Sequence, residues 1–276
     1  MAQRPFCASS MPTSESSSPE APCNLGGLSA LVTRPAHQAE GLCDQIAAAR
    51  GRPIRFPTLE ILGPTDKHAA RRELSAAIRA DLLIFVSANA VQYAFPLLPD
   101  QLPLDVEIAA IGGATAKALD ATGLTPTLTP TRMDSEGLLA LPSLQAMDGQ
   151  QVFILRGNGG RELIAEQLSS RGAEVHQIEV YRRQLPARSA AARNLVQGWD
   201  KLVDVVVATS NAILDNLFAL LGDQGAALVR RTPLIVVSQR MAEHAVALGC
   251  EVIYVAASAQ DQDVLAALCE VNEDVA

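Results

Sequence analysis

Short apolar runs alternate with amphipathic segments from residue 28 to the end of the chain. In the first amphipathic segment Leu42, Ile46 and Ala49 share one helical face, and Gly51 suits the end of a helix. Strands that alternate with helices of this kind predict βαβ units and a parallel sheet. The pattern predicts strand-then-helix pairs at 28–35 and 36–51, 80–87 and 88–95, 106–113 and 114–123, 150–157 and 158–172, 203–210 and 211–222, 232–239 and 240–249, and 251–258 and 259–271.

Two extended segments interrupt the alternation. Residues 52–63 carry Pro53 and Pro57, and residues 174–186 end at a proline. Since proline favours edge or exposed strands, we interpret these segments as paired linker strands at 53–61 and 176–184. The chain then divides into domain one (28–52 plus 185–276) and domain two (62–175), after a Ser- and Pro-rich tail at 1–27 that is predicted to be disordered.

The two halves of the sequence resemble each other. Arg34 in LVTRP matches Arg156 in FILRG, and Asn89 in VSANAV matches Asn211 in ATSNAI, both at an offset of 122 residues. SEGLLAL near residue 135 matches DQDVLAAL near residue 261 in the same order. The repeat predicts two similar α/β halves around a cleft.

Composition narrows the functional classes. Of 276 residues, 49% are hydrophobic and only 4% are aromatic, and the net charge is −8, which disfavours nucleic-acid binding. No stretch approaches the ~20 apolar residues of a membrane span. The five cysteines include no C-x-x-C pair, so neither a disulfide framework nor a zinc site is expected, and a cytoplasmic location fits best.

Small polar residues, glycines and arginines follow the predicted strands. In parallel sheets, ligands bind at the carboxyl ends of strands, where helix N-termini and arginines favour anions. The same residues also suit simple helix caps and turns. As candidate substrate-binding residues we take Thr33, Arg34, Ser87, Ala88, Asn89, Gly112, Thr115, Arg156, Gly157, Asn158, Thr209, Ser210, Asn211, Ser238 and Arg240.

The glycine-rich junctions do not complete a nucleotide-binding motif. Glu162 and Ala114 stand where a dinucleotide fingerprint needs glycine, and no Walker lysine follows either loop. The chain also lacks a G-x-S-x-G elbow. We therefore expect no cofactor and no metal, and a site that binds and orients its ligand.

The ordered set of junctions resembles the uroporphyrinogen-III synthase family. The matching segments lie within residues 28–270 and include LVTRP, VSANAV, SEGLL, ILRGNGG and VVSQRMAEHA. The resemblance implies two Rossmann-like or flavodoxin-like parallel-sheet domains joined by a two-stranded linker. One departure is Met241, where many relatives carry a small hydroxyl residue.

The resemblance also implies a reaction. The substrate would be hydroxymethylbilane, a linear tetrapyrrole with eight carboxylates, closed to uroporphyrinogen III with inversion of its last ring and loss of water. Tyr181 matches the family's tyrosine and would donate a proton to the leaving hydroxyl, and Arg161 would add positive charge. The expected partner is the enzyme that makes hydroxymethylbilane, and the expected state is a monomer. The alternative is a non-catalytic carboxylate-binding or regulatory protein with two lobes.

Overall fold

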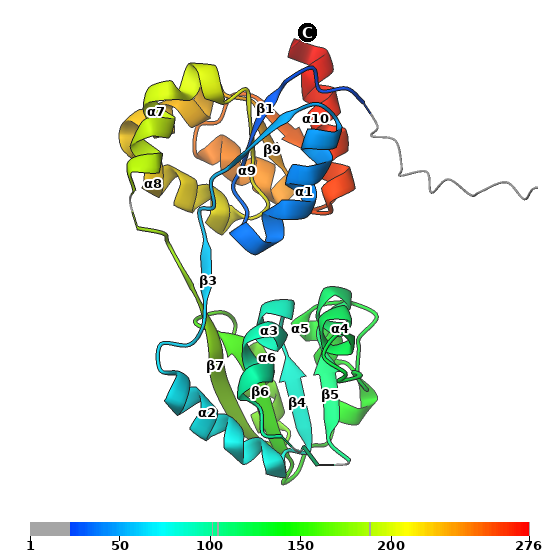
Figure 1. Ribbon diagram of the computed structural model, residues 1–276. Coiled ribbons are helices and arrows are strands. Elements are labelled where there is room, and N and C mark those ends of the chain that lie inside the picture. Colours follow the sequence, from blue (N-terminus) through cyan, green and yellow to red (C-terminus); the bar gives the residue numbers. More distant parts are fainter. Residues whose placement is uncertain (1–22, 101, 104, 188, 276) are drawn as a thin grey trace, which may run out of the picture. The chain divides into compact units, whose positions relative to one another are not determined.

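The computed structural model describes residues 23–275 except 101, 104 and 188 (Figure 1). The described residues divide into two compact units. Unit 1 combines the residues up to Phe56 with those from Ser189 onward, and unit 2 lies within Pro57–Arg188. Each unit is an α/β structure built on a largely parallel sheet, as the sequence predicts.

The sheet of unit 1 has the strand order β10-β9-β8-β1-β2 and is parallel throughout. Numbered along the unit, this is the 2-1-3-4-5 order of flavodoxin-like sheets. The strands are β1 (Ser29–Val32), β2 (Arg52–Arg55), β8 (Val205–Val207), β9 (Leu234–Val236) and β10 (Ile253–Val255).

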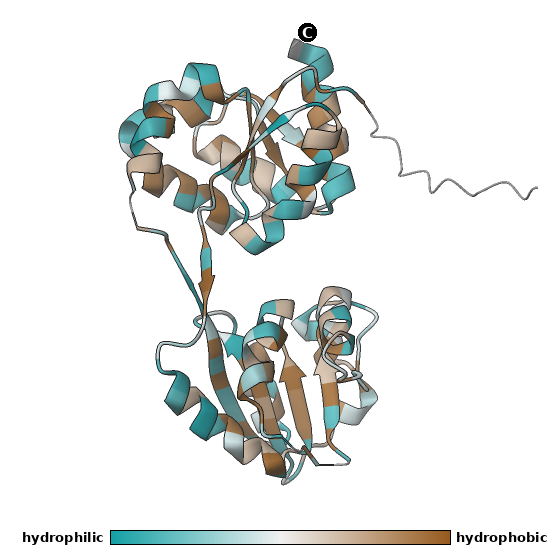
Figure 2. Ribbon diagram, in the orientation of Figure 1, coloured by the Kyte–Doolittle hydropathy of each residue, from teal (hydrophilic) through white to brown (hydrophobic). Residues whose placement is uncertain are grey.

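Helices cover both faces of this sheet. Leu42 and Ile46 of one helix and Val264 and Leu268 of another pack on Val32 and its neighbours at one face. Leu31, which points to the other face, is also fully buried, as expected for a doubly wound sheet. Figure 2 shows the apolar strands in brown and the polar helix surfaces in teal. The helices are α1 (Ala36–Ala48), α7 (Ala190–Leu202), α8 (Asn211–Arg231), α9 (Gln239–Ala247) and α10 (Asp261–Val275).

Helix α8 is long and apolar enough to cross a membrane by length and composition alone, although no such stretch was expected from the sequence. Gly222 has a non-helical backbone and breaks the helix in its middle. The buried side chains of α8 include Leu214, Leu217 and Val229, and the helix packs against α7. These contacts are typical of a core helix in a globular unit.

The sheet of unit 2 has the order β3-β7-β6-β4-β5, in which only β3 is antiparallel to its neighbour among the described strands. One face packs on the helices that carry Leu74, Val91 and Leu119, and the other on those that carry Leu138 and Leu168. The strands are β3 (Glu60–Leu62), β4 (Leu82–Phe85), β5 (Glu107–Ala110), β6 (Gln151–Gly157) and β7 (Glu174–Gln184). The helices are α2 (Lys67–Ser75), α3 (Ala88–Ala94), α4 (Gly113–Asp120), α5 (Ser135–Leu139) and α6 (Leu163–Ser170), with short 3₁₀ turns η1 (Ala76–Arg79), η2 (Phe95–Leu97) and η3 (Pro142–Leu144).

The sequence repeat crosses between the units. In unit 1 the order β2-β1-β8-β9 corresponds to β7-β6-β4-β5 in unit 2. The sheet of unit 1 therefore takes β1 and β2 from the first half of the repeat and its other strands from the second half. The sheet of unit 2 takes β6 and β7 from the second half and its other strands from the first half. Where unit 1 has β10, unit 2 has a single parallel bridge between Ala109 and Leu128. Arg34 and Arg156 consequently occupy the same place in their sheets.

The segments predicted as linker strands belong largely to the two sheets. Residues 53–55 lie in β2 and pair with β1, and residues 174–181 of β7 pair with β6. Residues 60–62 pair antiparallel with 182–184. Helices α2 and α7 were not predicted, although Asp66 and Ser189 accept the capping hydrogen bonds of Ala69 and Ala192 at their starts.

The predicted disordered tail lies outside the described residues up to residue 22, and the prediction is wrong for residues 23–27. Leu25 is fully buried in the core of unit 1, and its N–H donates to the Ala49 carbonyl at 2.8 Å. The expectation of no disulfide is also wrong, because Cys23 is bonded to Cys269 in α10. The two cysteines are 246 residues apart in sequence, so their spacing gave no indication of the bond.

Reduction of this disulfide should destabilise unit 1. The bond closes a very long loop, and such bonds typically contribute about 2–4 kcal/mol to the free energy of unfolding. Trp199, the sole tryptophan in the sequence, lies in unit 1, so its fluorescence in urea reports on that unit. We expect dithiothreitol to lower the urea midpoint of the native chain and to leave that of the Cys23→Ser/Cys269→Ser variant unchanged. Equal midpoints for the native chain with and without reductant would contradict the bond.

Candidate functional site

Each sheet has one point where consecutive connections leave in opposite directions. In unit 1 this point lies between β1 and β8, and in unit 2 it lies between β4 and β6. Ligands of open parallel sheets bind at the carboxyl ends of the strands at such points. Most of the predicted residues lie at the two switch points, while Gly112, Thr115, Ser238 and Arg240 follow the next strand along.

At the switch point of unit 1, two buried side chains are held by the protein itself. The Thr33 hydroxyl donates to the Val207 carbonyl at 2.6 Å and so joins β1 to β8. Arg34 forms an ion pair with Asp261 at the start of α10 and donates to the Ala259 carbonyl at 2.7 Å. The guanidinium of Arg34 therefore ties the last loop of the unit to the first strand.

Three of the predicted serines are helix caps. The hydroxyls of Ser87, Ser210 and Ser238 accept the N–H groups of Ala90, Ile213 and Met241, at 3.1–3.3 Å. This capping aligns the starts of α3, α8 and α9 with the strand ends, where Ala88, Asn89 and Thr209 also lie.

Other predicted residues differ in exposure. Thr115 is buried in α4, and Gly112 caps that helix. The next N–H, that of Gly113, donates to the Met133 sulfur at 3.3 Å. The side-chain oxygen of Asn211 is buried and has no hydrogen-bond partner among the described residues. Arg240 is exposed and forms no ion pair within the described part of the chain.

A cavity of about 370 Å³ lies at the carboxyl ends of β4, β5 and β6 in unit 2. Its apolar lining comes from Val86, Ile111, Ile154, Ile164 and Ala165. Its polar lining comes from Asp134, Ser135, Arg156, the loop 157–161, Gln177, Tyr181 and Arg183. The predictions included Arg156, Gly157, Asn158, Arg161 and Tyr181, and missed the others. A mixed lining of this size suits a small ring that carries carboxylates.

A second cavity of about 490 Å³ adjoins the first and shares Asn158, Gln177 and Tyr181 with it. Its other polar residues include Asp66, Glu73, Glu179 and Arg182. The acidic side chains distinguish this cavity from the first, where arginines predominate. A polycarboxylate would consequently be attracted to the first cavity and repelled by the second.

Tyr181 is buried between the two cavities, and its hydroxyl has two polar neighbours. The Ser87 hydroxyl lies 3.1 Å away, and a guanidinium N–H of Arg183 donates to the phenol oxygen at 3.0 Å. The ring stacks on Tyr93 with centroids 6.2 Å apart. Gly157 lies so close that a Cβ atom there would be 2.5 Å from the Tyr181 ring. The tyrosine is therefore held in one position by strands β6 and β7 and helix α3.

Asn158 fixes the end of β6 to β7. Its side-chain oxygen accepts the Arg183 N–H at 2.6 Å, and its side-chain nitrogen donates to the Arg183 carbonyl at 3.2 Å. Its own N–H donates to the Tyr181 carbonyl at 3.1 Å. Asn158 therefore extends the sheet past a register shift that lies between Arg156 and Gly157.

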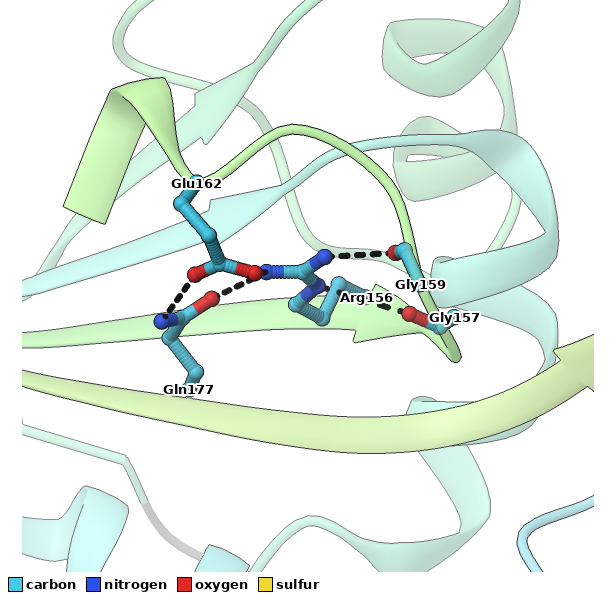
Figure 3. A network of polar contacts seen from close by, with 5 residues as sticks. All are labelled: Arg156, Gly157, Gly159, Glu162 and Gln177. Carbon is cyan, nitrogen blue, oxygen red and sulfur yellow. Dashed lines mark hydrogen bonds and ion pairs between the residues drawn. The ribbon is translucent and has the colours of Figure 1, made fainter. Parts of the chain in front are cut away.

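Arg156, which is itself buried, is the centre of a polar network that includes the exposed side chain of Glu162 (Figure 3). One terminal nitrogen donates to Glu162 at 2.8 Å and also to Gln177, and the other donates to the Gly159 carbonyl. Gln177 in turn donates to the second oxygen of Glu162 at 2.7 Å. The hydrogen bonds from Gln177 and from Arg156 lower the pKa of Glu162.

No group of three or more histidine, cysteine, aspartate or glutamate side chains within the described residues could hold a metal ion. The first cavity offers hydrogen-bond donors, an apolar wall and a phenol. The chemistry that these groups supply is binding, orientation and proton donation.

The fold and this cavity define a protein with two doubly wound α/β units that presents an anion-favouring site at a switch point. Among proteins of this class, a family model described as uroporphyrinogen-III synthase HemD matches residues 41–266. The uroporphyrinogen-III synthase of Escherichia coli (strain K12) is 35% identical over 87% of this chain and all of its own length. A putative uroporphyrinogen-III synthase of Methanothermobacter thermautotrophicus is 34% identical over 76% of this chain and 82% of its own. The chain belongs to the uroporphyrinogen-III synthase family.

Solved structures agree on the fold. A mutant uroporphyrinogen III synthase from the extremely thermophilic bacterium Thermus thermophilus aligns over 89% of this chain and 99% of its own with a TM-score of 0.62, at 19% identity. The enzyme from Helicobacter pylori 26695 aligns over 90% of this chain and all of its own with a TM-score of 0.55, at 15% identity. The predicted family and fold class are thereby confirmed.

Substitution of Gly157 should disturb the tyrosine directly. In Gly157→Ala the new methyl group overlaps the Tyr181 ring, and overpacking of this kind costs about 1–3 kcal/mol. The matched control is Gly63→Ala, whose added carbon would lie at an ordinary 3.8 Å from the Tyr93 ring. Urea unfolding followed by circular dichroism should show a lower free energy of unfolding for Gly157→Ala and little change in that free energy for Gly63→Ala. Equal stabilities would mean that the Tyr181 ring has room to move.

The ion pair of Glu162 should make stability depend on pH. Its pKa in the folded chain lies below the usual value of 4.5, so its contribution is present above that value and is lost as the pH falls through the lowered pKa. The free energy of unfolding of Glu162→Gln should therefore fall less between about pH 5 and pH 3 than that of the native chain. Identical pH profiles would contradict the role of the carboxylate.

Proposed function

We propose that the chain acts as a uroporphyrinogen-III synthase, a lyase that converts hydroxymethylbilane to uroporphyrinogen III and water. The observation that carries the proposal is the buried Tyr181, which lines a cavity of mixed apolar and arginine-rich character at the switch point of unit 2. Membership of the family identifies the substrate class. The cavity chemistry is suited to a pyrrole ring with acidic side chains.

The substrate binds at the carboxyl ends of the strands. The isoleucines of the cavity contact the face of a pyrrole ring, while backbone N–H groups and exposed cations receive the carboxylates. Arg161 is 71% exposed despite an ion pair with Glu136 at 3.1 Å, so it can exchange that partner for a substrate carboxylate. At the switch point of unit 1, the capped helix start at Ser210 and Asn211 serves the same purpose.

Tyr181 supplies the proton for the first step. The C–O bond of the terminal hydroxymethyl group breaks with electrons from the pyrrole nitrogen, the phenol proton joins the departing hydroxide to give water, and a protonated azafulvene cation is left beside the Tyr181 phenolate. Arg183, which donates to the phenol oxygen at 3.0 Å, stabilises the negative charge left there. The substituted carbon of the last ring then attacks to give a spiro-pyrrolenine. Rearrangement closes the macrocycle, and the proton released when the last ring becomes aromatic again restores Tyr181.

The rest of the acceleration of ring closure comes from the orientation of the two ends of the substrate. Hydroxymethylbilane closes unaided to the type I isomer, so the protein must hold the two ends in the geometry that leads to inversion. Holding reacting ends in one geometry is worth about 7–11 kcal/mol. This requirement accounts for a site built from backbone groups, a phenol and arginines.

The partner, oligomeric state and location remain predictions. We propose that the enzyme producing hydroxymethylbilane passes it to this chain, since the substrate is unstable, and that the chain works as a monomer in the cytoplasm, where the Cys23–Cys269 bond is open to reduction. The competing idea is a carboxylate-binding or regulatory protein without catalysis, although the guanidiniums of Arg34 and Arg156 are already engaged by protein groups. Formation of product distinguishes the two.

Activity should appear as a change in isomer ratio. The purified chain, incubated with freshly generated hydroxymethylbilane, should yield mainly the type III isomer after oxidation and chromatography of the porphyrins. Type I alone from folded protein would overturn the proposal and favour the carboxylate-binding alternative.

Removal of the Tyr181 hydroxyl should slow the reaction. General acid catalysis contributes about 10²- to 10⁴-fold in many enzymes, and we expect Tyr181→Phe to lower kcat by about 100-fold, at the low end of that range, with a smaller change in KM. The control is Tyr93→Phe, which loses only a hydrogen bond to the Ile61 carbonyl. Full activity of Tyr181→Phe would exclude the phenol as the proton donor.

A further inference from the structure

The guanidinium of Arg156 serves the protein itself. Its side chain is only 10% exposed although it lines the first cavity, and its donors are directed to protein oxygens. Figure 3 shows Glu162 and Gln177 at one side of the guanidinium and the carbonyls of Gly157 and Gly159 at the other. Arg156 therefore links β7 and the start of α6 to the glycine-rich loop 157–161.

The hydrogen bonds of Arg156 engage two carbonyls of the loop. The Gly159 carbonyl accepts from a terminal nitrogen and the Gly157 carbonyl accepts from Nε at 3.4 Å. Gly159 and Gly160 both have a positive φ, at 66° and 103°. The N–H groups of Gly159, Gly160 and Arg161 have no hydrogen-bond partner among the described residues. Successive backbone N–H groups in a turn are a known kind of anion-binding site, and these three N–H groups are free to serve as one.

Arg34, the residue of unit 1 that corresponds to Arg156, independently supports the idea that this arginine holds a loop in place. Arg34 occupies the same place in its sheet, and it too combines a carboxylate, Asp261, with a loop carbonyl, that of Ala259. The repeat has thus kept a buried arginine that holds a loop at the switch point in both units. A residue retained only to bind substrate would not need carbonyl partners in each copy.

We propose that Glu162 and Gln177 are positioning residues. They hold Arg156, and Arg156 in turn fixes the loop 157–161 so that its N–H groups receive a carboxylate of the substrate. The inference rests on the proposed function, deepens it at the same site, and assigns Arg156 to the support of the loop. Glu162 anchors the network by charge, and Gln177 bridges its two charged members.

The effect of Glu162 on KM distinguishes this role from direct binding. If Arg156 were itself the substrate ligand, Glu162 would compete for it, and removing the carboxylate would lower KM. If Arg156 supports the loop, removing the carboxylate loosens the loop and raises KM. Loss of a hydrogen bond to a charged group corresponds to about a tenfold change.

Steady-state kinetics with hydroxymethylbilane test the two outcomes. We expect Glu162→Ala and Gln177→Leu to raise KM about tenfold, with a much smaller effect on kcat, and Glu162→Gln, which retains an acceptor for Arg156, to recover part of the loss. Glu162→Ala should add nothing further in an Arg156→Met background. The control is Asp200→Asn, which removes an exposed ion pair with Arg231 in unit 1. A lower KM in Glu162→Ala, or no change in either variant, would overturn the proposal.

Limited digestion with trypsin tests the support of the loop without relying on activity. The bond after Arg161 lies in the loop, and Gln177 is far from it in sequence. We expect Gln177→Leu to accelerate cleavage after Arg161 several-fold while the urea midpoint of unit 2 stays unchanged, and Asp200→Asn to leave cleavage unaltered. An unchanged rate in Gln177→Leu would overturn the inference even if the chain makes the type III isomer. Faster cleavage in a chain that makes only type I would instead contradict the proposed function alone.

Discussion

The arrangement of both sites depends on the pairing of strands from opposite halves of the repeat. In unit 1, β1 of the first half pairs with β8 of the second, and in unit 2, β6 of the second half pairs with β4 of the first. These central strands are buried on both faces, so the pairing is fixed by the packing of their apolar side chains. Because connections diverge on either side of each pair, the carboxyl ends of the paired strands are left open to a ligand.

Equivalent positions in the two units have acquired different surroundings. Asp261 at the start of α10 neutralises Arg34, whereas the position matched to it in the repeat is Ser135, which lines the cavity of unit 2. Arg156 is neutralised instead by Glu162, from the far end of its own loop. In unit 2 the carboxylate next to this position, Asp134, caps α5 and pairs with Arg132 instead of Arg156. The two copies therefore share a scaffold while unit 2 presents the cavity with Tyr181.

The alternating elements, the repeat and the family were predictable because each leaves a local or periodic signal in the sequence. Contacts between residues that are far apart in the sequence were not predictable in this way. The bond between Cys23 and Cys269 and the burial of Leu25 depend on the packing of residues 23–25 in the core of unit 1, near α10. Helix α7 was not predicted, although the sequence contains signals for it. Ser189 is a typical capping residue, and Leu195 and Trp199 have the spacing of one helical face. The partners of Arg156 arise from a strand pairing that a single sequence does not encode locally, so its contacts with Glu162, Gln177 and Gly159 were not predicted.

The central claim is that backbone N–H groups at the strand ends bind the tetrapyrrole. Hydrogen–deuterium exchange of the full chain, measured by mass spectrometry with and without uroporphyrinogen III, tests it most directly. The account predicts slower exchange in the peptide that covers residues 157–163, where Gly159, Gly160 and Arg161 have unpartnered N–H groups among the described residues, and in the peptide that covers the start of α8. Protection confined to other segments, with the loop 157–161 unchanged, would contradict it.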